Sequence, residues 1–488
     1  MNSAVAIPGH GLASGPKAQK DLNPDPSTWL RKATPLPRAQ LITLCLVRIV
    51  VPIAFGQVFP SLADPYALIL RFWTSTKDPS QIGFFSGLVE SSFAVSQLLF
   101  IYHWAWLSDR FGRRPIIIIG TLGVAIMTIV FGLSKSIPEL LLFRCIAGFF
   151  AATASVVHTV LGEITDTTNQ AAAFPLYGPL IGGSLSNPAA KYALFDIKLF
   201  HVHPYFLPGL VSGVVSLMGV ALAYFCLDES LSTKRRSNTG SCTSSTETIE
   251  NEIDLKLPSP TARELLSIPI IRALCLSGFA LEMNGTSFVV LFVLFCYSPI
   301  QQGGLAFPAE ITGYALAFTG FIAGITQLFL MPLLLRRFEA AKIYTVCIAA
   351  WPIVFLILPC FNLIARYGLM VNEATGELGV HAKAILWTGI FLDLALSRIG
   401  GIAYPASMIL IKNNVPSPSY LGSTNGLVQW FMCLSRCVSA AFASSAFALS
   451  AKYNILGGHF WAILHACIAI VGWWLARSIT VNSKTTLS

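Results

Sequence analysis

Charged residues are scarce in this chain of 488 residues: only 11% are Asp, Glu, Lys or Arg, whereas 54% are hydrophobic. Soluble domains carry about 25% charged residues. Too few charges remain to cover a protein of this size with a water-facing surface. The composition therefore excludes an ordinary soluble domain and predicts that much of the surface meets lipid.

Motifs of several functional classes are also missing. The chain has no GxxxxGK[ST] loop of an ATP-driven pump, no HExxH and no CxxC, and its 11 cysteines lie mostly inside apolar runs. The net charge of +9 is scattered between apolar runs, whereas nucleic-acid binding needs clustered basic residues. We therefore expect no enzymatic activity, no cofactor, no bound metal and no nucleic-acid partner.

Long apolar segments are abundant. A bilayer core of about 30 Å needs about 20 helical residues. About 12 segments come near this length. They are 39–60, 82–106, 115–133, 138–161, 171–186, 206–227, 267–298, 310–335, 343–365, 384–411, 420–449 and 457–480. The sequence predicts an all-α membrane protein that spans the lipid bilayer with these helices.

A polar segment rich in Ser, Thr and charge divides the predicted spans into two groups of equal number, as in pseudo-symmetric secondary transporters. We predict a disordered tail at 1–38, an N-terminal half at 39–227, a linker at 228–266, a C-terminal half at 267–480 and a second tail at 481–488. Lys and Arg favour one side of the membrane, about 20 against about 8, which predicts cytoplasmic termini and a cytoplasmic linker. The first 38 residues have no apolar core, so we expect a tail there rather than a secretory signal peptide.

A tight charged turn separates the second and third predicted spans. In "AWLSDRFGRRP", Asp109, Arg110, Gly112, Arg113 and Arg114 precede Pro115, after which the apolar character resumes. By composition alone this is a basic turn held at the cytoplasmic leaflet. Its spacing resembles G-x-x-x-D-R-x-G-R-R, the signature of the major facilitator superfamily, with Ala105 in place of the opening glycine.

The resemblance implies a role for this turn as a conformational latch. In the family the aspartate sits against the N-terminal end of span eleven and holds the two halves in an outward-open state. Ser423 and Thr424 are expected to cap that helix. Glu163 is expected to pair with Arg110 or Arg113 at the end of span four.

Further segments resemble one branch of this superfamily. "FRCIAGFFAA" resembles the family's R-x-x-x-G motif through Arg144 and Gly148. "YGPLIGG" resembles the antiporter motif of the drug:proton branch through Gly178, Pro179, Gly182 and Gly183. "LFVLFCYSPIQQGGL" and "MILIKNNVPSPSYLGSTNGLVQ" resemble fungal and plant carriers related to zinc-induced facilitator-like proteins.

Two departures from the family pattern bear on function. The fifth span, 171–186, reaches about 24 Å, about 6 Å less than the hydrocarbon core. Either the bilayer adapts to it or a piece is missing, through splicing or a gene-model error. Val51 stands where related carriers often have an acidic residue, which puts proton coupling in question.

Charged residues inside predicted spans are candidates for substrate or proton sites, because a charge at mid-membrane is costly and usually faces a cavity with a partner. The candidates are Arg48, Glu90, Glu282, Asp393, Arg398 and Arg436. Asp393 and Arg398 do not share a helix face well, so we expect each to find a partner on a neighbouring helix.

We predict a monomeric secondary transporter that moves a small organic solute or drug by alternating access, with proton-coupled antiport and multidrug efflux as the expected mode. Two alternatives remain: a proton-independent uniporter, and a degenerate carrier that acts as a receptor or scaffold. The substrate is not readable, and both plasma membrane and vacuolar membrane remain open.

Overall fold

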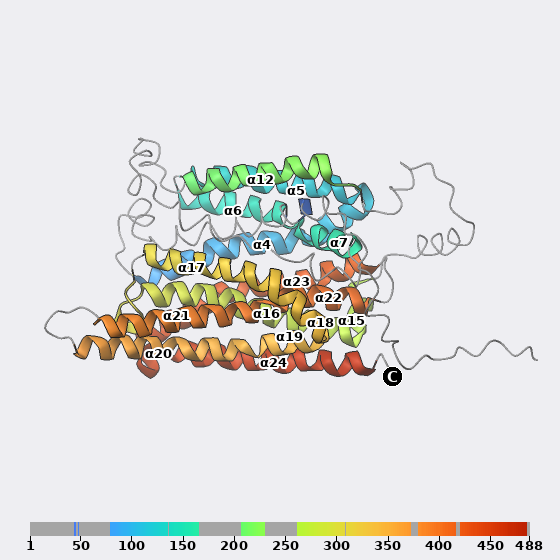
Figure 1. The fold of residues 1–488 in the computed structure, drawn as a ribbon. Helices are drawn as coiled ribbons and strands as arrows, with labels where there is room; N and C mark the ends of the chain where they lie inside the picture. Colours follow the sequence, from blue (N-terminus) through green and yellow to red (C-terminus); the bar gives the residue numbers. More distant parts are fainter. Residues whose placement is uncertain are drawn as a thin grey trace, which may run out of the picture. The chain divides into compact units, whose positions relative to one another are not determined.

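The computed structural model describes residues 43–44, 47, 79–134, 136–164, 206–229, 261–307, 309–371, 379–415 and 420–485. All regular elements in these ranges are helical (Figure 1). Eight helical stretches among them are long and apolar enough to cross a membrane. All predicted spans except 39–60 and 171–186 coincide with described helices, and these two lie outside the described residues apart from Thr43, Leu44 and Val47. The expected all-helical membrane fold is confirmed.

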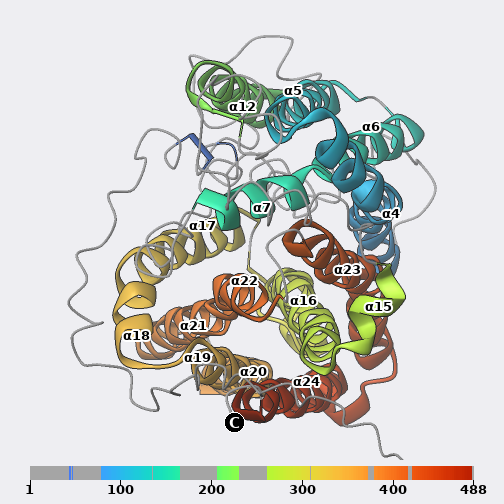
Figure 2. The ribbon, with the colours of Figure 1, turned by 90° about the vertical axis from the view of Figure 1, so that its right-hand side faces the viewer.

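The described helices fall into two sets along the chain. The N-terminal set comprises α4 (Pro79–Phe111), α5 (Arg113–Phe131), α6 (Ile137–Ala151), α7 (Ala154–Ile164) and α12 (Phe206–Cys226). The C-terminal set comprises α15 (Ala262–Ser267), α16 (Pro269–Tyr297), η3 (Ile300–Gln302), α17 (Ala309–Ile325), η4 (Thr326–Leu330), α18 (Met331–Arg337), α19 (Ala340–Ile348), α20 (Ala350–Val371), α21 (Val380–Gly401), α22 (Ala403–Asn414), α23 (Leu421–Lys452), η6 (Ile455–Gly458) and α24 (Phe460–Thr485). Viewed end on, α5, α6 and α12 lie on one side and α19, α20 and α24 on the other (Figure 2).

Local sequence explains where several helices begin. Gly112 adopts φ +104° between α4 and α5, a conformation that glycine tolerates and other residues rarely adopt. The N–H of Gly112 donates to the Ser108 carbonyl at 3.0 Å, which closes the last turn of α4. Thr261 and Glu264 form a reciprocal capping box at the start of α15.

Four predicted spans are each built from more than one helical piece. These are α6 with α7, α17 with η4 and α18, α19 with α20, and α21 with α22. The element η4 is a turn of π-helix within the eighth predicted span. Such turns are found often at functional sites because they release backbone groups from the regular ladder. The predicted spans 138–161, 310–335, 343–365 and 384–411 are therefore present but interrupted.

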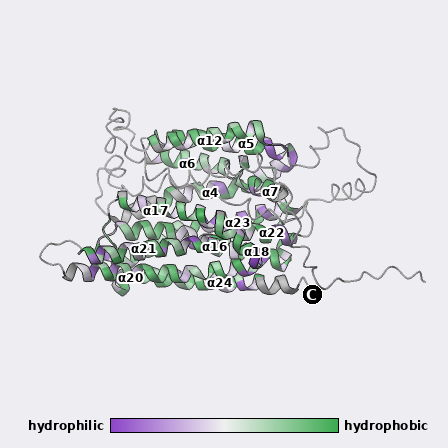
Figure 3. Ribbon diagram, viewed as in Figure 1, coloured by the Kyte–Doolittle hydropathy of each residue, from purple (hydrophilic) through white to green (hydrophobic). Residues whose placement is uncertain are grey.

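The helix ends near Asp109 are called the Asp109 end, and the other ends the opposite end. Because the chain reverses direction at each span, α4 and α7 finish at the Asp109 end, where α5, α16, α19 and α23 begin. Hydrophilic residues gather near helix ends, whereas the helices are mostly hydrophobic along their lengths (Figure 3). This pattern is the one a bilayer-spanning bundle requires.

The buried apolar core shows how the two sets contact each other. The largest cluster contains residues of both sets, including Ile101, Trp104, Val156, Leu274 and Ile409, and these lie towards the Asp109 end. Three other clusters lie towards the opposite end, and each contains residues of one set only. Among the described residues, continuous apolar packing between the sets is therefore confined to the Asp109 end.

Candidate functional site

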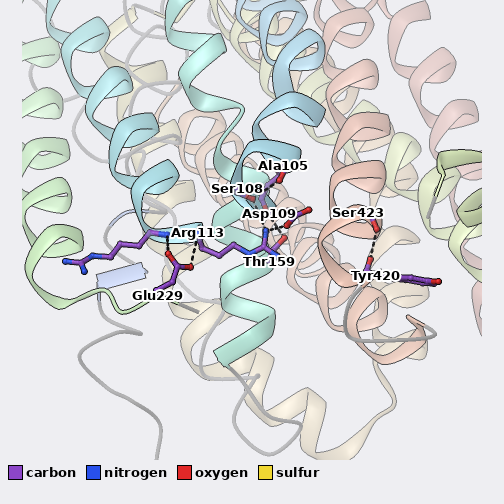
Figure 4. Close-up of polar contacts among 10 residues, drawn as sticks. Ala105, Ser108, Asp109, Arg113, Thr159, Glu229, Tyr420 and Ser423 are labelled. Atoms are coloured by element: carbon purple, nitrogen blue, oxygen red, sulfur yellow. Dashed lines mark hydrogen bonds and ion pairs between the residues drawn. The ribbon is translucent and has the colours of Figure 1, made fainter. Parts of the chain in front are cut away.

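The charged turn after α4 is organised around Arg113, whose side chain is only 8% exposed. Its Nη1 donates to Asp109 Oδ1 at 2.5 Å and to Ser108 Oγ at 2.8 Å (Figure 4). The Asp109 side chain is 50% exposed, so this ion pair is partly solvated and stabilises the fold by about 1 kcal/mol or less. The ion pair matters for where it places the two side chains, at the turn after α4, more than for the stability it adds.

Glu229, just after α12, holds the start of α5. Its two carboxylate oxygens accept the backbone N–H of Arg113 at 2.8 Å and of Arg114 at 3.2 Å. A carboxylate is favoured at this place because the first N–H groups of a helix lack intrahelical partners and carry partial positive charge. The Arg114 side chain in turn donates to the Tyr224 carbonyl and lies over the ring of that residue. The turn is thereby attached to α12.

The same turn lies against the beginning of α23. A Cβ placed on Gly422 would lie 3.4 Å from Arg113 Nη2 and 3.6 Å from Asp109 Oδ1. One turn further along, a Cβ on Gly426 would lie 3.8 Å from the Cβ of Ala105. Ala105 replaces the glycine of the family motif, and the close approach of the helices is kept because the partner residue is itself glycine.

The predicted capping of span eleven by Ser423 and Thr424 is wrong. The helix begins at Leu421 with Tyr420 as its N-cap, and no side chain caps it. The Ser423 hydroxyl donates back to the Tyr420 carbonyl at 3.0 Å. Both residues lie inside the first turn, where a hydroxyl reaches the preceding carbonyl more readily than a free N–H.

A second polar cluster lies at the middle of three long helices. The Nε of Arg436 in α23 donates to Oε1 of Glu282 in α16 at 2.8 Å, and Nη2 forms an ion pair with the same oxygen at 2.8 Å. Its Nη1 donates to Gln97 Oε1 in α4 at 3.0 Å. Gln97 Nε2 donates to the Ala151 carbonyl at 3.2 Å, where α6 ends. The contact of Arg436 with Gln97 joins the two helix sets at mid-length.

Burial makes this central cluster energetically important. The side chains of Arg436 and Glu282 are 18% and 8% exposed. Removing two charges from water costs several kcal/mol per ion, so neither charge is stable there without the other. The Thr286 hydroxyl adds a longer contact to Glu282 Oε1 at 3.4 Å.

The remaining predicted site residues with described side chains have separate surroundings. Arg144 is 2% exposed, and its guanidinium lies over the rings of Phe93 and Phe131, at 4.9 Å and 5.4 Å from the centroids. Arg110 lies over the Trp106 ring at 5.5 Å. The Nε of Arg398 donates to Ser397 at 3.2 Å.

Asp393 in α21 is 2% exposed, and neither carboxylate oxygen has a hydrogen-bond partner within the described part of the chain. The expectation that it pairs with a neighbouring helix is therefore wrong for the helices described. Leu386 and Ile390 of the same helix are also buried and belong to the apolar core of the C-terminal set.

Several predicted site residues lie wholly or partly outside the described residues. Glu90 belongs to α4 and Glu163 to α7, but their side chains lie outside the described residues. The whole of Arg48, Gly178, Pro179, Gly182 and Gly183 lies outside them as well. The latch pairing of Glu163 and the antiporter motif remain predictions.

Sequence reasoning missed two residues that the structure places at these sites. Glu229 follows span six directly, and no local motif marks it as a helix-capping carboxylate. Gln97 lies in an apolar run and carries no motif at all. No group of three or more His, Cys, Asp or Glu able to hold a metal ion occurs among the described residues.

Comparison with known proteins agrees with the geometry. The model of the Major Facilitator Superfamily matches residues 44–440. The Major facilitator-type transporter psiT2 of Psilocybe cubensis is 35% identical over 94% of this chain and 93% of that protein. The multidrug transporter mfsB of Aspergillus fumigatus is 26% identical over 91% of this chain and 84% of that protein. The Arabidopsis thaliana protein ZINC INDUCED FACILITATOR-LIKE 1 is 25% identical over 85% and 84%.

The fold has a solved counterpart in the human organic anion transporter MFSD10 (TETRAN), with a TM-score of 0.61 and 16% identity over 91% of this chain and all of that chain. Fungal multidrug transporters and plant zinc-induced facilitator-like proteins are thus among the relatives, as the motifs predicted. The chain belongs to the Major Facilitator Superfamily, a family of multi-pass membrane transporters.

Proposed function

We propose that this protein is a secondary active transporter that moves a small organic solute out of the cytoplasm by alternating access, in exchange for protons. The N-terminal and C-terminal helix sets, extended to the boundaries 39–227 and 267–480, are the two moving halves. The proposal agrees with the name of mfsB, a multidrug transporter.

The distribution of the apolar core is the observation that carries the proposal. The two sets share one core at the Asp109 end and have separate cores at the opposite end. A transporter that opens at one end at a time has this arrangement in one of its two states. Asp109 and Arg113 lie next to Gly422 at the closed end, where a latch would act.

The side of the membrane follows from the basic residues. Arg110, Arg113 and Arg114 lie at the Asp109 end, as do Arg336 and Arg337 at the end of α18. Positive residues favour the cytoplasmic side. We infer that the Asp109 end and both termini are cytoplasmic, in either the plasma membrane or the vacuolar membrane. The closed end is then the cytoplasmic one.

Proton coupling has three acidic candidates, Glu90, Glu282 and Asp393. Asp393 is buried among the described helices without a partner there, whereas Glu282 is held by Arg436. A carboxylate that exchanges protons must spend part of the cycle without a counter-charge, so Asp393 fits the carrier role better in this state.

Uniport is a second candidate function, and the ion pair of Glu282 favours it. The charge of Glu282 is compensated by Arg436, whose Nε and Nη2 both lie 2.8 Å from Oε1. If Glu282 is the only acid in the transport path, the cycle runs without protons.

The test is transport by the purified full chain in proteoliposomes, across a broad panel of radiolabelled organic solutes, with and without an imposed pH gradient. Antiport predicts uptake of at least one solute that a gradient accelerates and that Asp393→Asn uncouples from the gradient. Glu339→Gln, at an exposed pair with Lys342, is the matched control. Uptake that ignores the gradient supports uniport. Failure to move any solute overturns transport and favours the receptor or scaffold.

A further inference from the structure

The central cluster leaves one charged acceptor unused. Both contacts between Arg436 and Glu282 involve Oε1, and the Thr286 hydroxyl also donates to that oxygen. Oε2 accepts no hydrogen bond from the described part of the chain. It is not fully buried either, so some of its surface is accessible. Glu282 as a whole is 6% exposed. A nearly buried carboxylate oxygen with no donor is costly unless a ligand supplies one.

A second oxygen lies one turn along the same helix. Gly285 follows Glu282 by three residues in α16, about 4.5 Å along the axis. The Tyr404 hydroxyl of α22 occupies the space that a Cβ on Gly285 would need. Residues three apart lie on the same side of a helix. The absence of a side chain at Gly285 therefore lets a tyrosine oxygen approach the side of α16 that carries Glu282.

The charges around these oxygens select the sign of a ligand. Arg436 donates from Nε to Glu282 Oε1 and from Nη1 to Gln97, and its Nη2 forms an ion pair with the same Glu282 oxygen. An anion beside Oε2 would meet the negative carboxylate first, because the guanidinium contacts the other oxygen, Oε1, and it would be repelled. A protonated amine carries three N–H donors and a positive charge, which match a carboxylate oxygen and a hydroxyl oxygen.

We propose that Glu282 and Tyr404 form a binding site for the ammonium group of a small organic amine, with Arg436 fixing the Glu282 carboxylate. If the protein is a transporter, this site defines organic amines as its substrate class, so this part of the inference rests on the proposed function. Glu282 Oε2 and the Tyr404 hydroxyl accept hydrogen bonds from the ammonium. Arg436 positions the acceptor without touching the amine.

Binding is tested without transport, using the full chain in nanodiscs and three aromatic probes that differ in charge. The probes are 2-phenylethylamine, 2-phenylethanol and 3-phenylpropionate, and the readout is the shift in thermal unfolding midpoint over a titration near neutral pH. The site predicts a saturable upward shift with the amine and none with the alcohol or the carboxylate. Tyr404→Phe, which leaves the ion pair intact, should weaken the amine by about threefold to tenfold.

Glu282→Gln should weaken amine binding by more than about tenfold, because a charge-assisted bond is lost. Since that variant leaves Arg436 uncompensated, Glu282→Leu combined with Arg436→Met serves as a packed apolar replacement that should also lose binding. Glu339→Gln and Tyr453→Phe, both at exposed positions, are matched controls that should bind as the parent does.

The site is overturned if the carboxylate or the alcohol stabilises the protein as well as the amine does, if the amine binds the apolar double variant unchanged, or if no probe binds. Its failure is separate from failure of the proposed function. Proteoliposomes that transport a solute which is not an amine would leave the transporter intact without this site. Amine binding without any transport would leave the site intact and overturn the transporter.

Discussion

Replacing Arg436 by Met tests the central ion pair most severely. The substitution keeps much of the side-chain volume but leaves the Glu282 carboxylate buried without its counter-charge. Two unit charges 2.8 Å apart attract by about 6 kcal/mol at an effective dielectric constant of about 20. Desolvation of both ions offsets most of this in the intact pair, so the pair itself contributes little net stability.

Removing one partner is a different matter, because the cost of burying the other charge is then uncompensated. Such a loss is typically about 3–5 kcal/mol. The Arg436 side chain is 18% exposed, which lets some solvent screen the remaining carboxylate, so we expect a value near about 3 kcal/mol. The contact with Gln97 disappears in the same variant and adds to the loss.

Reversible chemical unfolding of the parent, Arg436→Met, Glu282→Leu and the double variant measures this energy as a double-mutant cycle. Each single substitution should destabilise the protein, and the double variant should recover most of the loss, since a packed apolar pair needs no counter-charge. If Arg436→Met costs less than about 1 kcal/mol, or if the two losses simply add, the pair is not buried and coupled as the structure places it.

Three further predictions use other parts of the fold. Gly148→Ala should lower the free energy of unfolding by about 1–3 kcal/mol, because the added Cβ would meet a backbone carbonyl of α4. Gly278→Ala should be nearly neutral, because its Cβ would face side-chain atoms at 3.5 Å. Equal losses of stability in chemical unfolding would contradict this packing. Glu229→Gln should cost about 1 kcal/mol by removing a charge from the start of α5, and a loss that persists unchanged in high salt would exclude this cause. Burial lowers the pKa of His459 below its usual 6.5, and the Arg366 guanidinium lowers that pKa further, so below about pH 6.5 the unfolded chain binds the proton more readily than the folded one. Stability should therefore fall as the pH drops from about 7.5 to about 5, and His459→Gln should flatten that part of the profile; an unchanged slope in the variant would contradict the assignment.

The spans were predictable because the signal is local. A run of about 20 apolar residues crosses a bilayer whatever its neighbours are, and every span that falls on described residues was found. The breaks within them were not predictable. The interruption at Ala152 and Thr153, for example, involves no proline and no loss of apolar character.

The charged turn was predictable for a similar reason, since Asp109, Gly112 and Arg113 lie within five residues of one another. The residues that contact this turn could not be predicted from the local sequence. Glu229 lies 116 residues from Arg113 in the chain, and no motif links the two. Ala105 replaces the family's glycine, and the compensating Gly426 lies on a helix far along the chain.

The central pair shows the limit of sequence reasoning most clearly. Glu282 and Arg436 were both singled out because charges inside a bilayer need a reason. They are 154 residues apart in the sequence. Their helices are apolar on nearly every side, so the sequence does not indicate which face of each helix packs against which neighbouring helix. Only the packing of α16 against α23 brings the two together, with Gln97 reaching them from the other set.

The central claim is that the two helix sets move about this mid-length contact, so that the closed Asp109 end opens. The most direct measurement is the distance between spin labels at Phe225→Cys and Phe338→Cys, exposed positions in α12 and just after α18. All 11 native cysteines are first replaced by Ser, so that only these two positions take the label. The account predicts two distances whose populations shift between acidic and neutral pH or on addition of 2-phenylethylamine. A single distance that neither condition changes would contradict it.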